Sequence, residues 1–220
     1  LVNTTAPTAA ITNNTGSKVI TCSTTSISVT ATGGDTYKWS GGLGTKAAAT
    51  ISAAGTYTVT ATTTSNGCTD TESITITKDV SAPTAAAGTD FTKTCTSNAS
   101  GATIGAAAVS GETYSWSPTK GLDDASKANP TADPAATTTY TVTATKTSTG
   151  CTDTDDVTVT VNTTAPTAGI TNNTKETEIN CTTTSISVTA TGGGTYSWSG
   201  GSTPKTAANT FTAAGKYTVT

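Results

Sequence analysis

The chain has 220 residues, of which 33% are hydrophobic, 5% aromatic and 11% charged, and its formal net charge is −3. It contains no His, and all 11 of its basic residues are Lys, which excludes His-dependent catalysis and most zinc sites. The absence of Arg also excludes the basic surface that nucleic acid requires, and no apolar run approaches the roughly 20 residues that span a bilayer, so no membrane insertion is expected.

Three motifs recur along the chain in the same order. Ala-Pro-Thr-Ala begins at residues 6, 82 and 165, Tyr-x-Trp-Ser at 37, 114 and 196, and Tyr-Thr-Val-Thr at 57, 140 and 217. The distances from Cys22 to Cys181 and from Trp39 to Trp198 are both 159 residues, which indicates two repeat types that alternate. We expect the tail of a preceding repeat at 1–5, a first repeat at 6–80, a second at 81–163, and a third, truncated repeat at 164–220.

Each repeat is predicted to consist of β-strands. Apolar and polar residues alternate with a period of two, which is typical of antiparallel sheets with one buried face. Short strands between Gly-containing turns, over roughly 80 residues, indicate an all-β immunoglobulin-like sandwich of about seven strands. Pro at each repeat junction limits bending, so a rod-like array is expected. The alternating residues are Ile27, Val29 and Ala31; Tyr57, Val59 and Ala61; Ile74 and Ile76; and Val157, Val159 and Val161.

Aromatic residues recur at the same places in each repeat, and two interpretations exist for them. The Trp residues could be platforms that stack carbohydrate, or they could fill the core. The alternation places each Tyr-x-Trp pair on one face and favours the core. The predicted core aromatics are Tyr37, Trp39, Tyr57, Tyr114, Trp116, Tyr140, Tyr196, Trp198 and Tyr217.

The five Cys residues indicate disulfides and therefore a compartment outside the cytoplasm. We expect one disulfide within each complete repeat, Cys22 with Cys68 and Cys95 with Cys151, while truncation removes the partner of Cys181. The other hypothesis joins neighbouring repeats through Cys68 with Cys95 and Cys151 with Cys181. Metal binding is disfavoured because there is no Cys-x-x-Cys and no His.

Acidic residues follow the second Cys of each complete repeat, at Asp70 and Glu72 and at Asp153 and Asp155. Alternate carboxylates on a strand point to one face and are weak candidates for a Ca²⁺ site. The other interpretation is a solvated strand edge whose charges discourage aggregation. No other cofactor is expected.

The second copy contains Tyr114–Pro118, Asn129-Pro130, Thr137–Val142 and Gly150-Cys151, and with these residues it resembles the PKD-like and Ig-like repeats of large surface proteins in Bacteroidota. The first and third copies, with Cys-x-Thr-Thr-Ser-Ile-Ser-Val-Thr-Ala-Thr-Gly-Gly, resemble repeats of the SprB-like gliding adhesins of that phylum. The resemblance implies type IX secretion, display on the outer cell surface, and a role in adhesion or gliding motility. In the second copy, Gly and Ala replace the Ile-Ser-Val-Thr strand over 102–109, so its core should be looser.

The sequence therefore predicts a non-enzymatic stalk of a large extracellular adhesin, whose partners are the other repeats of the same chain. Two other hypotheses stay open, a subunit of a self-assembling extracellular filament and a module that binds surface glycans or partner proteins. The adjacent carboxylates of Asp123-Asp124 do not favour an enzyme, because nothing fixes the separation that glycosidase chemistry needs.

Overall fold

The computed structural model of the chain describes residues 3–220, which form strands, turns and loops; of the predicted tail 1–5, residues 1 and 2 lie outside the described part. No helix that could cross a membrane occurs in residues 3–220. The chain divides into two compact units, residues 1–161 and residues 162–220. The first unit contains two separate hydrophobic cores and the second unit contains one. The architecture is that of all-β, immunoglobulin-like modules.

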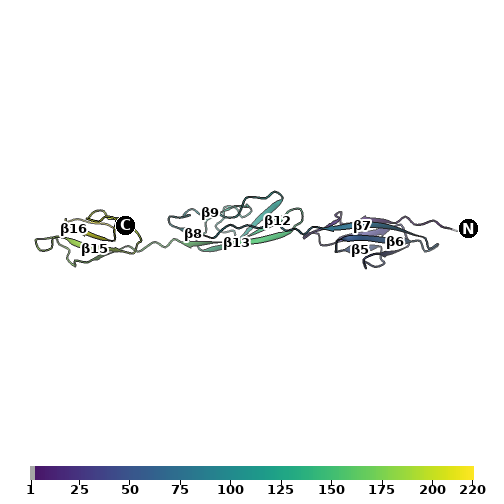
Figure 1. The fold of residues 1–220 in the computed structure, drawn as a ribbon, viewed down its shortest axis with the longest axis horizontal. Coiled ribbons are helices and arrows are strands. Elements are labelled where there is room, and N and C mark those ends of the chain that lie inside the picture. Colours follow the sequence, from purple (N-terminus) through teal and green to yellow (C-terminus); the bar gives the residue numbers. More distant parts are fainter. Residues whose placement is uncertain (1–2) are drawn as a thin grey trace. The chain divides into compact units, whose positions relative to one another are not determined.

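The first repeat is a β-sandwich of a three-stranded sheet, β1-β3-β5, and a four-stranded sheet, β2-β7-β6-β4 (Figure 1). Alternation on β3 turns Ile27, Val29 and Ala31 inward, where each is at most 2% exposed. The strands are β1 (Ala10–Asn13), β2 (Val19–Ile20), β3 (Ile27–Thr32), β4 (Thr36–Trp39), β5 (Ala48–Ile51), β6 (Gly55–Thr62) and β7 (Thr69–Lys78).

One pair of strands in the first repeat is parallel. β2 lies along the last residues of β7, with Val19 opposite Thr77 and Ile20 opposite Lys78. The backbone N–H of Asp79 continues this pairing by donating to the carbonyl of Ile20 at 2.9 Å. The end of β2 and the chain's exit toward the second repeat therefore lie at the same end of the sandwich.

The second repeat has a four-stranded sheet, β10-β12-β13-β8, and a two-stranded sheet, β11-β9 (Figure 1). β9 is only two residues long, because the Gly- and Ala-rich stretch that replaces the expected strand offers few side chains that could pack. The strands are β8 (Phe91–Thr94), β9 (Ala102–Thr103), β10 (Glu112–Ser117), β11 (Thr131–Ala132), β12 (Thr138–Lys146) and β13 (Thr152–Asn162).

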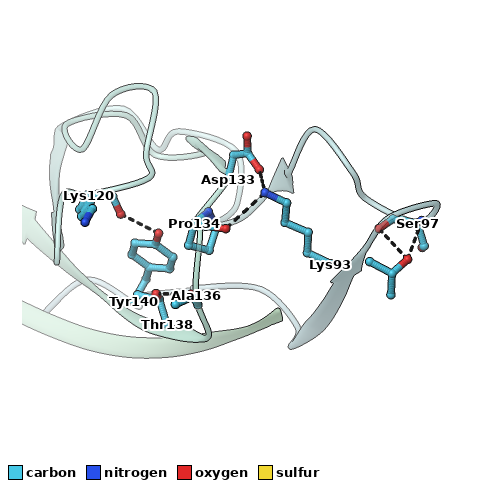
Figure 2. A network of polar contacts seen from close by, with 9 residues as sticks. Lys93, Ser97, Lys120, Asp133, Pro134, Ala136, Thr138 and Tyr140 are labelled. Carbon is cyan, nitrogen blue, oxygen red and sulfur yellow. Dashed lines mark hydrogen bonds and ion pairs between the residues drawn. The ribbon is translucent and has the colours of Figure 1, made fainter. Parts of the chain in front are cut away.

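Polar contacts compensate for the short β9. Figure 2 shows Lys93 of β8 reaching the segment after β11, where its ammonium group pairs with Asp133 and donates to the carbonyl of Pro134 at 3.2 Å. In the same view the buried Tyr140 donates from its hydroxyl to the carbonyl of Lys120 at 2.8 Å. These bonds hold the irregular loops of the second repeat against its large sheet.

The third repeat forms one sheet, β14-β15-β16, in the second unit. A groove of about 490 Å³ beside this sheet is lined in part by Ile179, Ile186, Phe211 and Tyr217. In the first repeat the residue that matches Ile179 is Ile20, which is buried in the core beside β7. The strands are β14 (Gly169–Asn172), β15 (Ile186–Thr191) and β16 (Ala208–Phe211).

The three Trp residues lie in the three cores, and Trp39, Trp116 and Trp198 are 4%, 1% and 5% exposed. Each indole N–H donates to a backbone carbonyl at 2.9–3.0 Å, so the polar edge of each ring is satisfied within its repeat. Rings held in this way have no free face on which a sugar could stack. The remaining predicted aromatics also contact these cores, namely Tyr37, Tyr57, Tyr114, Tyr140, Tyr196 and Tyr217.

Candidate functional site at the junction of the first two repeats

The principal covalent feature of the molecule is a disulfide between Cys22 of the first repeat and Cys151 of the second, with the Cα atoms 5.0 Å apart. The expected pairing within each repeat, Cys22 with Cys68 and Cys95 with Cys151, is therefore wrong. The other hypothesis was right that bonds join neighbouring repeats, but it paired different residues. The bond closes over a sequence separation of 129 residues.

The geometry of the first repeat explains why its two Cys residues do not pair. Cys68 immediately precedes the first residue of β7, whereas Cys22 follows β2, which pairs with the last residues of that strand. The ten residues of β7 separate the two positions by roughly 30 Å at about 3.3 Å per residue. A disulfide needs Cα atoms within about 7 Å, so only a neighbouring repeat can supply the partner of Cys22.

A turn and a hairpin meet around the disulfide. The turn at residues 21–24 follows β2, and the hairpin at residues 146–151 joins β12 to β13. Ser23 in the turn donates from its backbone N–H (3.1 Å) and its hydroxyl (3.2 Å) to the carbonyl of Thr149 in the hairpin. Cys151 is only 1% exposed and Thr149 2%, so the turn covers the hairpin closely.

Gly150 makes this close approach possible. Its φ of +68° lies in the left-handed region that favours glycine, and a Cβ atom placed on it would lie 2.7 Å from the Cβ of Ser23. Any larger residue would push the turn away from the hairpin. The Thr-Gly-Cys sequence therefore serves the contact between repeats as well as the hairpin itself.

The linker between the repeats is tied to the same hairpin. Lys146 donates from its ammonium group to the hydroxyl of Ser81 at 2.6 Å, and Thr149 donates from its hydroxyl to the carbonyl of Ser81 at 3.5 Å. Ser81 in turn donates from its hydroxyl (2.6 Å) and its backbone N–H (3.0 Å) to the carboxylate of Asp79. These bonds, with a smaller contribution from the charge of Lys146, lower the pKa of Asp79 below its ordinary value.

The four acidic residues proposed as Ca²⁺ ligands occupy matching positions in the first two repeats. They lie at the start of β7 and β13, at the end of each sandwich where the chain enters, and three of their carboxylates accept hydrogen bonds from backbone amides of that entering segment. Within residues 3–220, no three His, Cys, Asp or Glu side chains gather where they could hold a metal ion. The bonds run from Ala9 N to Asp70 (2.9 Å), from Ala85 N to Asp153 (2.9 Å) and from Ala87 N to Asp155 (2.8 Å), while Glu72 lies exposed on β7.

The three other Cys residues occupy positions that match the ends of the observed bond. Cys68 is half-buried at the end of the β6–β7 hairpin, Cys95 is exposed directly after β8, and Cys181 is exposed in the turn at residues 180–183. Sequence reasoning found all five residues but not the pairing, because the pairing depends on which end of a sandwich each one occupies. The parallel pairing of β2 with β7 places Cys22 at the exit end of its sandwich. β2 has only two residues, too few for a sequence pattern that would predict this pairing.

No protein-family model matches the chain, and no curated protein matches it. Three solved structures, each of several modules or domains, are similar to the chain at 10–17% identity. Their TM-scores are below 0.5, so the fold assignment depends on the sheets of this chain alone. They are the fibronectin(III)-like modules of Clostridium thermocellum CbhA (12% identity, 70% of this chain and 95% of that one, TM-score 0.34), the three N-terminal domains of the bacteriophage RB49 outer capsid protein Hoc (17%, 87% and 75%, 0.37), and the eight N-terminal Ig domains of Down Syndrome Cell Adhesion Molecule (10%, 97% and 41%, 0.37).

Proposed function

We propose that the chain is a load-bearing spacer, a non-enzymatic segment of an extracellular stalk whose disulfides carry tension from one repeat to the next. The observation that carries this proposal is the Cys22–Cys151 bond. A pull along the backbone reaches Cys22, crosses the two sulfur atoms and continues from Cys151. The residues between them, which include most of both sandwiches, are therefore bypassed by the force.

The disulfide prevents a long segment of the backbone from being extended under load. A sequence separation of 129 residues corresponds to roughly 450 Å of extended chain at about 3.5 Å per residue. Even if both sandwiches unfold under load, the oxidised chain cannot release this length. A spacer built in this way keeps its reach under tension, whereas a chain of independent modules would lengthen stepwise as each one unfolds.

Single-molecule stretching of the full chain, held at its two ends, tests this proposal. We expect the total length released on unfolding to be about 450 Å shorter for the oxidised chain than for the chain in reductant. The Cys22→Ser variant should release the longer length in either condition, and Cys181→Ser should behave like the unchanged chain. Equal released lengths for the oxidised and reduced chains would contradict the spacer role.

The location and the parent protein are further parts of the proposal. A disulfide between repeats persists in an oxidising environment, which supports an address outside the cytoplasm. The resemblance of the repeats to those of Bacteroidota gliding adhesins supports a stalk that serves surface attachment or gliding. Protease treatment of intact cells that express the parent protein tests the address, since a surface stalk is degraded while cytoplasmic markers survive.

A further inference from the structure

The Cys22 turn has a close copy in the third repeat. Cys181 lies 159 residues after Cys22, the same offset that relates the Trp residues of these two repeats. In the turns at 21–24 and 180–183, the first residue donates from its backbone N–H to the carbonyl of the fourth, at 2.9 and 2.8 Å. The fourth residue donates back to the side-chain oxygen of the first, at 3.0 and 2.9 Å. The two turns therefore present their Cys residues in the same local geometry.

The Cys151 hairpin likewise has a close copy in the first repeat, at residues 63–68. In both hairpins the first residue donates from its backbone N–H to the carbonyl of the Cys, at 3.0 Å in the first repeat and 2.9 Å in the second. Gly67 and Gly150 have φ values of +71° and +68°. The incoming chain is bound in the same way, since the side chain two residues before the Cys donates to the carbonyl of Thr5 in one case and of Ser81 in the other.

The two hairpins differ in what covers them. Ser23 lies against Gly150, and Cys151 is almost completely buried. At Gly67 a Cβ atom would meet nothing within 4 Å, and Cys68 is half-buried. The first repeat therefore exposes, at its entry end, the surface that in the second repeat receives the Cys22 turn.

We propose that the observed disulfide is one instance of a general rule, in which the first Cys of a repeat bonds to the second Cys of the next repeat along the chain. Cys181 then takes the hairpin Cys of a following repeat like the second one, and Cys68 takes the turn Cys of a preceding repeat. The partner of both surfaces is a further repeat of the same kind. This pairing is independent of the load-bearing role, which adds a use for it.

The chemistry of the step is a two-electron oxidation. Two thiols lose two protons and two electrons, and the new S–S bond forms. A disulfide oxidant such as oxidised glutathione accepts these protons and electrons and is released as two thiols.

Gly at the position of Gly150 leaves room for the Cβ atom of Thr182, which replaces Ser23 in the third repeat. In an array that obeys the rule, the bonds formed by Cys22 and Cys181 leave the backbone from Cys151 to Cys181, 181 − 151 = 30 residues, to carry tension between them.

An extended chain tests the rule. Residues 61–161 of the same sequence are appended after Thr220, which completes the third repeat and adds a second copy of the second repeat. The protein is refolded in a mixture of reduced and oxidised glutathione, remaining thiols are alkylated, and non-reduced tryptic peptides are identified by mass spectrometry. Because the appended segment ends at Val161, its Cys151 peptide differs in mass from the original one.

We expect Cys181 to be linked to the appended copy of Cys151 and Cys95 to the appended copy of Cys68, alongside the Cys22–Cys151 bond. The Cys181→Ser variant should lose only the link from Cys181, and the Cys22–Cys151 bond in the same molecules reports correct folding. A link from Cys181 to the appended copy of Cys68, or alkylated Cys181 beside an intact Cys22–Cys151 bond, overturns the rule. Absence of the Cys22–Cys151 bond as well overturns the observed pairing, the rule and the spacer role together. A failure at Cys181 alone overturns the rule and leaves the spacer role standing, and equal stretching lengths overturn the spacer role and leave the rule standing, so the two failures are distinguishable.

Discussion

Gly150 is the residue on which the approach of the two repeats depends most directly. Its counterpart Gly67 has nearly the same backbone conformation but faces open space, so the two glycines form a matched pair. Substitution by Ala costs about 1–2 kcal/mol at either position because of the left-handed conformation. Only at Gly150 does the added Cβ also collide with Ser23.

We therefore predict that Gly150→Ala disfavours the Cys22–Cys151 bond. Overpacking costs about 1–3 kcal/mol, which corresponds to a decrease of roughly 5- to 150-fold in the equilibrium constant for forming the bond. The measurement is the ratio of oxidised to reduced protein in glutathione buffers of known composition. Gly67→Ala should leave this ratio unchanged, and an equal effect of both substitutions would show that Ser23 does not set the contact.

Asp79 is the titrating residue of the linker. Its pKa is lowered first by the Ser81 hydroxyl, then by the Ser81 backbone N–H and the charge of Lys146. Because the folded-state pKa is lowered, the ionised carboxylate stabilises the folded chain at pH values above its ordinary pKa of 3.8. This stabilisation is lost as the pH falls through the lower, folded-state pKa.

In a titration followed by carbon NMR of the Asp79 carboxylate, we expect a midpoint below 3.8. The Ser81→Ala substitution should raise this midpoint more than Lys146→Ala does, because the hydroxyl bond is the largest cause of the shift. If Lys146→Ala has the larger effect, the linker is held mainly by charge and not by the Ser81 hydrogen bonds.

At the scale of the elements, the starts of β7 and β13 use carboxylates to fix the chain that enters each repeat. The Asp155 carboxylate accepts the backbone N–H of Ala87, a residue that is 0% exposed. We predict that Asp155→Ala lowers the stability of the second repeat by about 1–3 kcal/mol, because a buried donor loses its acceptor. Hydrogen exchange of the β12 and β13 amides measures this change.

Asp156 is the control, since it points to the opposite face of β13. Asp156→Ala should change the stability by at most about 0.5 kcal/mol. If the two substitutions have the same effect, the charge of this strand matters and the bond to Ala87 does not.

The strands also show how far sequence reasoning reaches. Period-two alternation is a local property, and β3, β6, β7 and β13 contain the residues for which it was predicted. The alternation also indicated that Trp39 and its counterparts face inward, where the structure places them. β2 has two residues, too few for a period, and its parallel pairing with β7 is a long-range choice. That choice determines the disulfide, so the candidate site could not be predicted although its Cys residues could be named.

In the first unit of the molecule, the two repeats are joined by the linker, by one disulfide and by a few hydrogen bonds. The hydrogen bonds that run directly from one repeat to the other go from Ser23 to the carbonyl of Thr149. A typical hydrogen bond adds only about 0.5–1.5 kcal/mol, and ordering the surrounding turn and hairpin opposes even that gain. The hydrogen bonds select the contact, and the disulfide makes it persist.

We therefore predict that removal of the disulfide lets the first two repeats reorient independently. In ¹⁵N relaxation measurements on the oxidised chain, amides of β6 and β12 should report one common rotational correlation time, because the bond couples the two sandwiches. In the Cys22→Ser, Cys151→Ser double variant, the two correlation times should shorten and separate, while each sandwich keeps its chemical shifts away from the junction. Cys181→Ser, which leaves the bond in place, should match the unchanged chain. A double variant with the same common correlation time would mean that the linker bonds of Ser81 and Lys146 suffice to hold the junction.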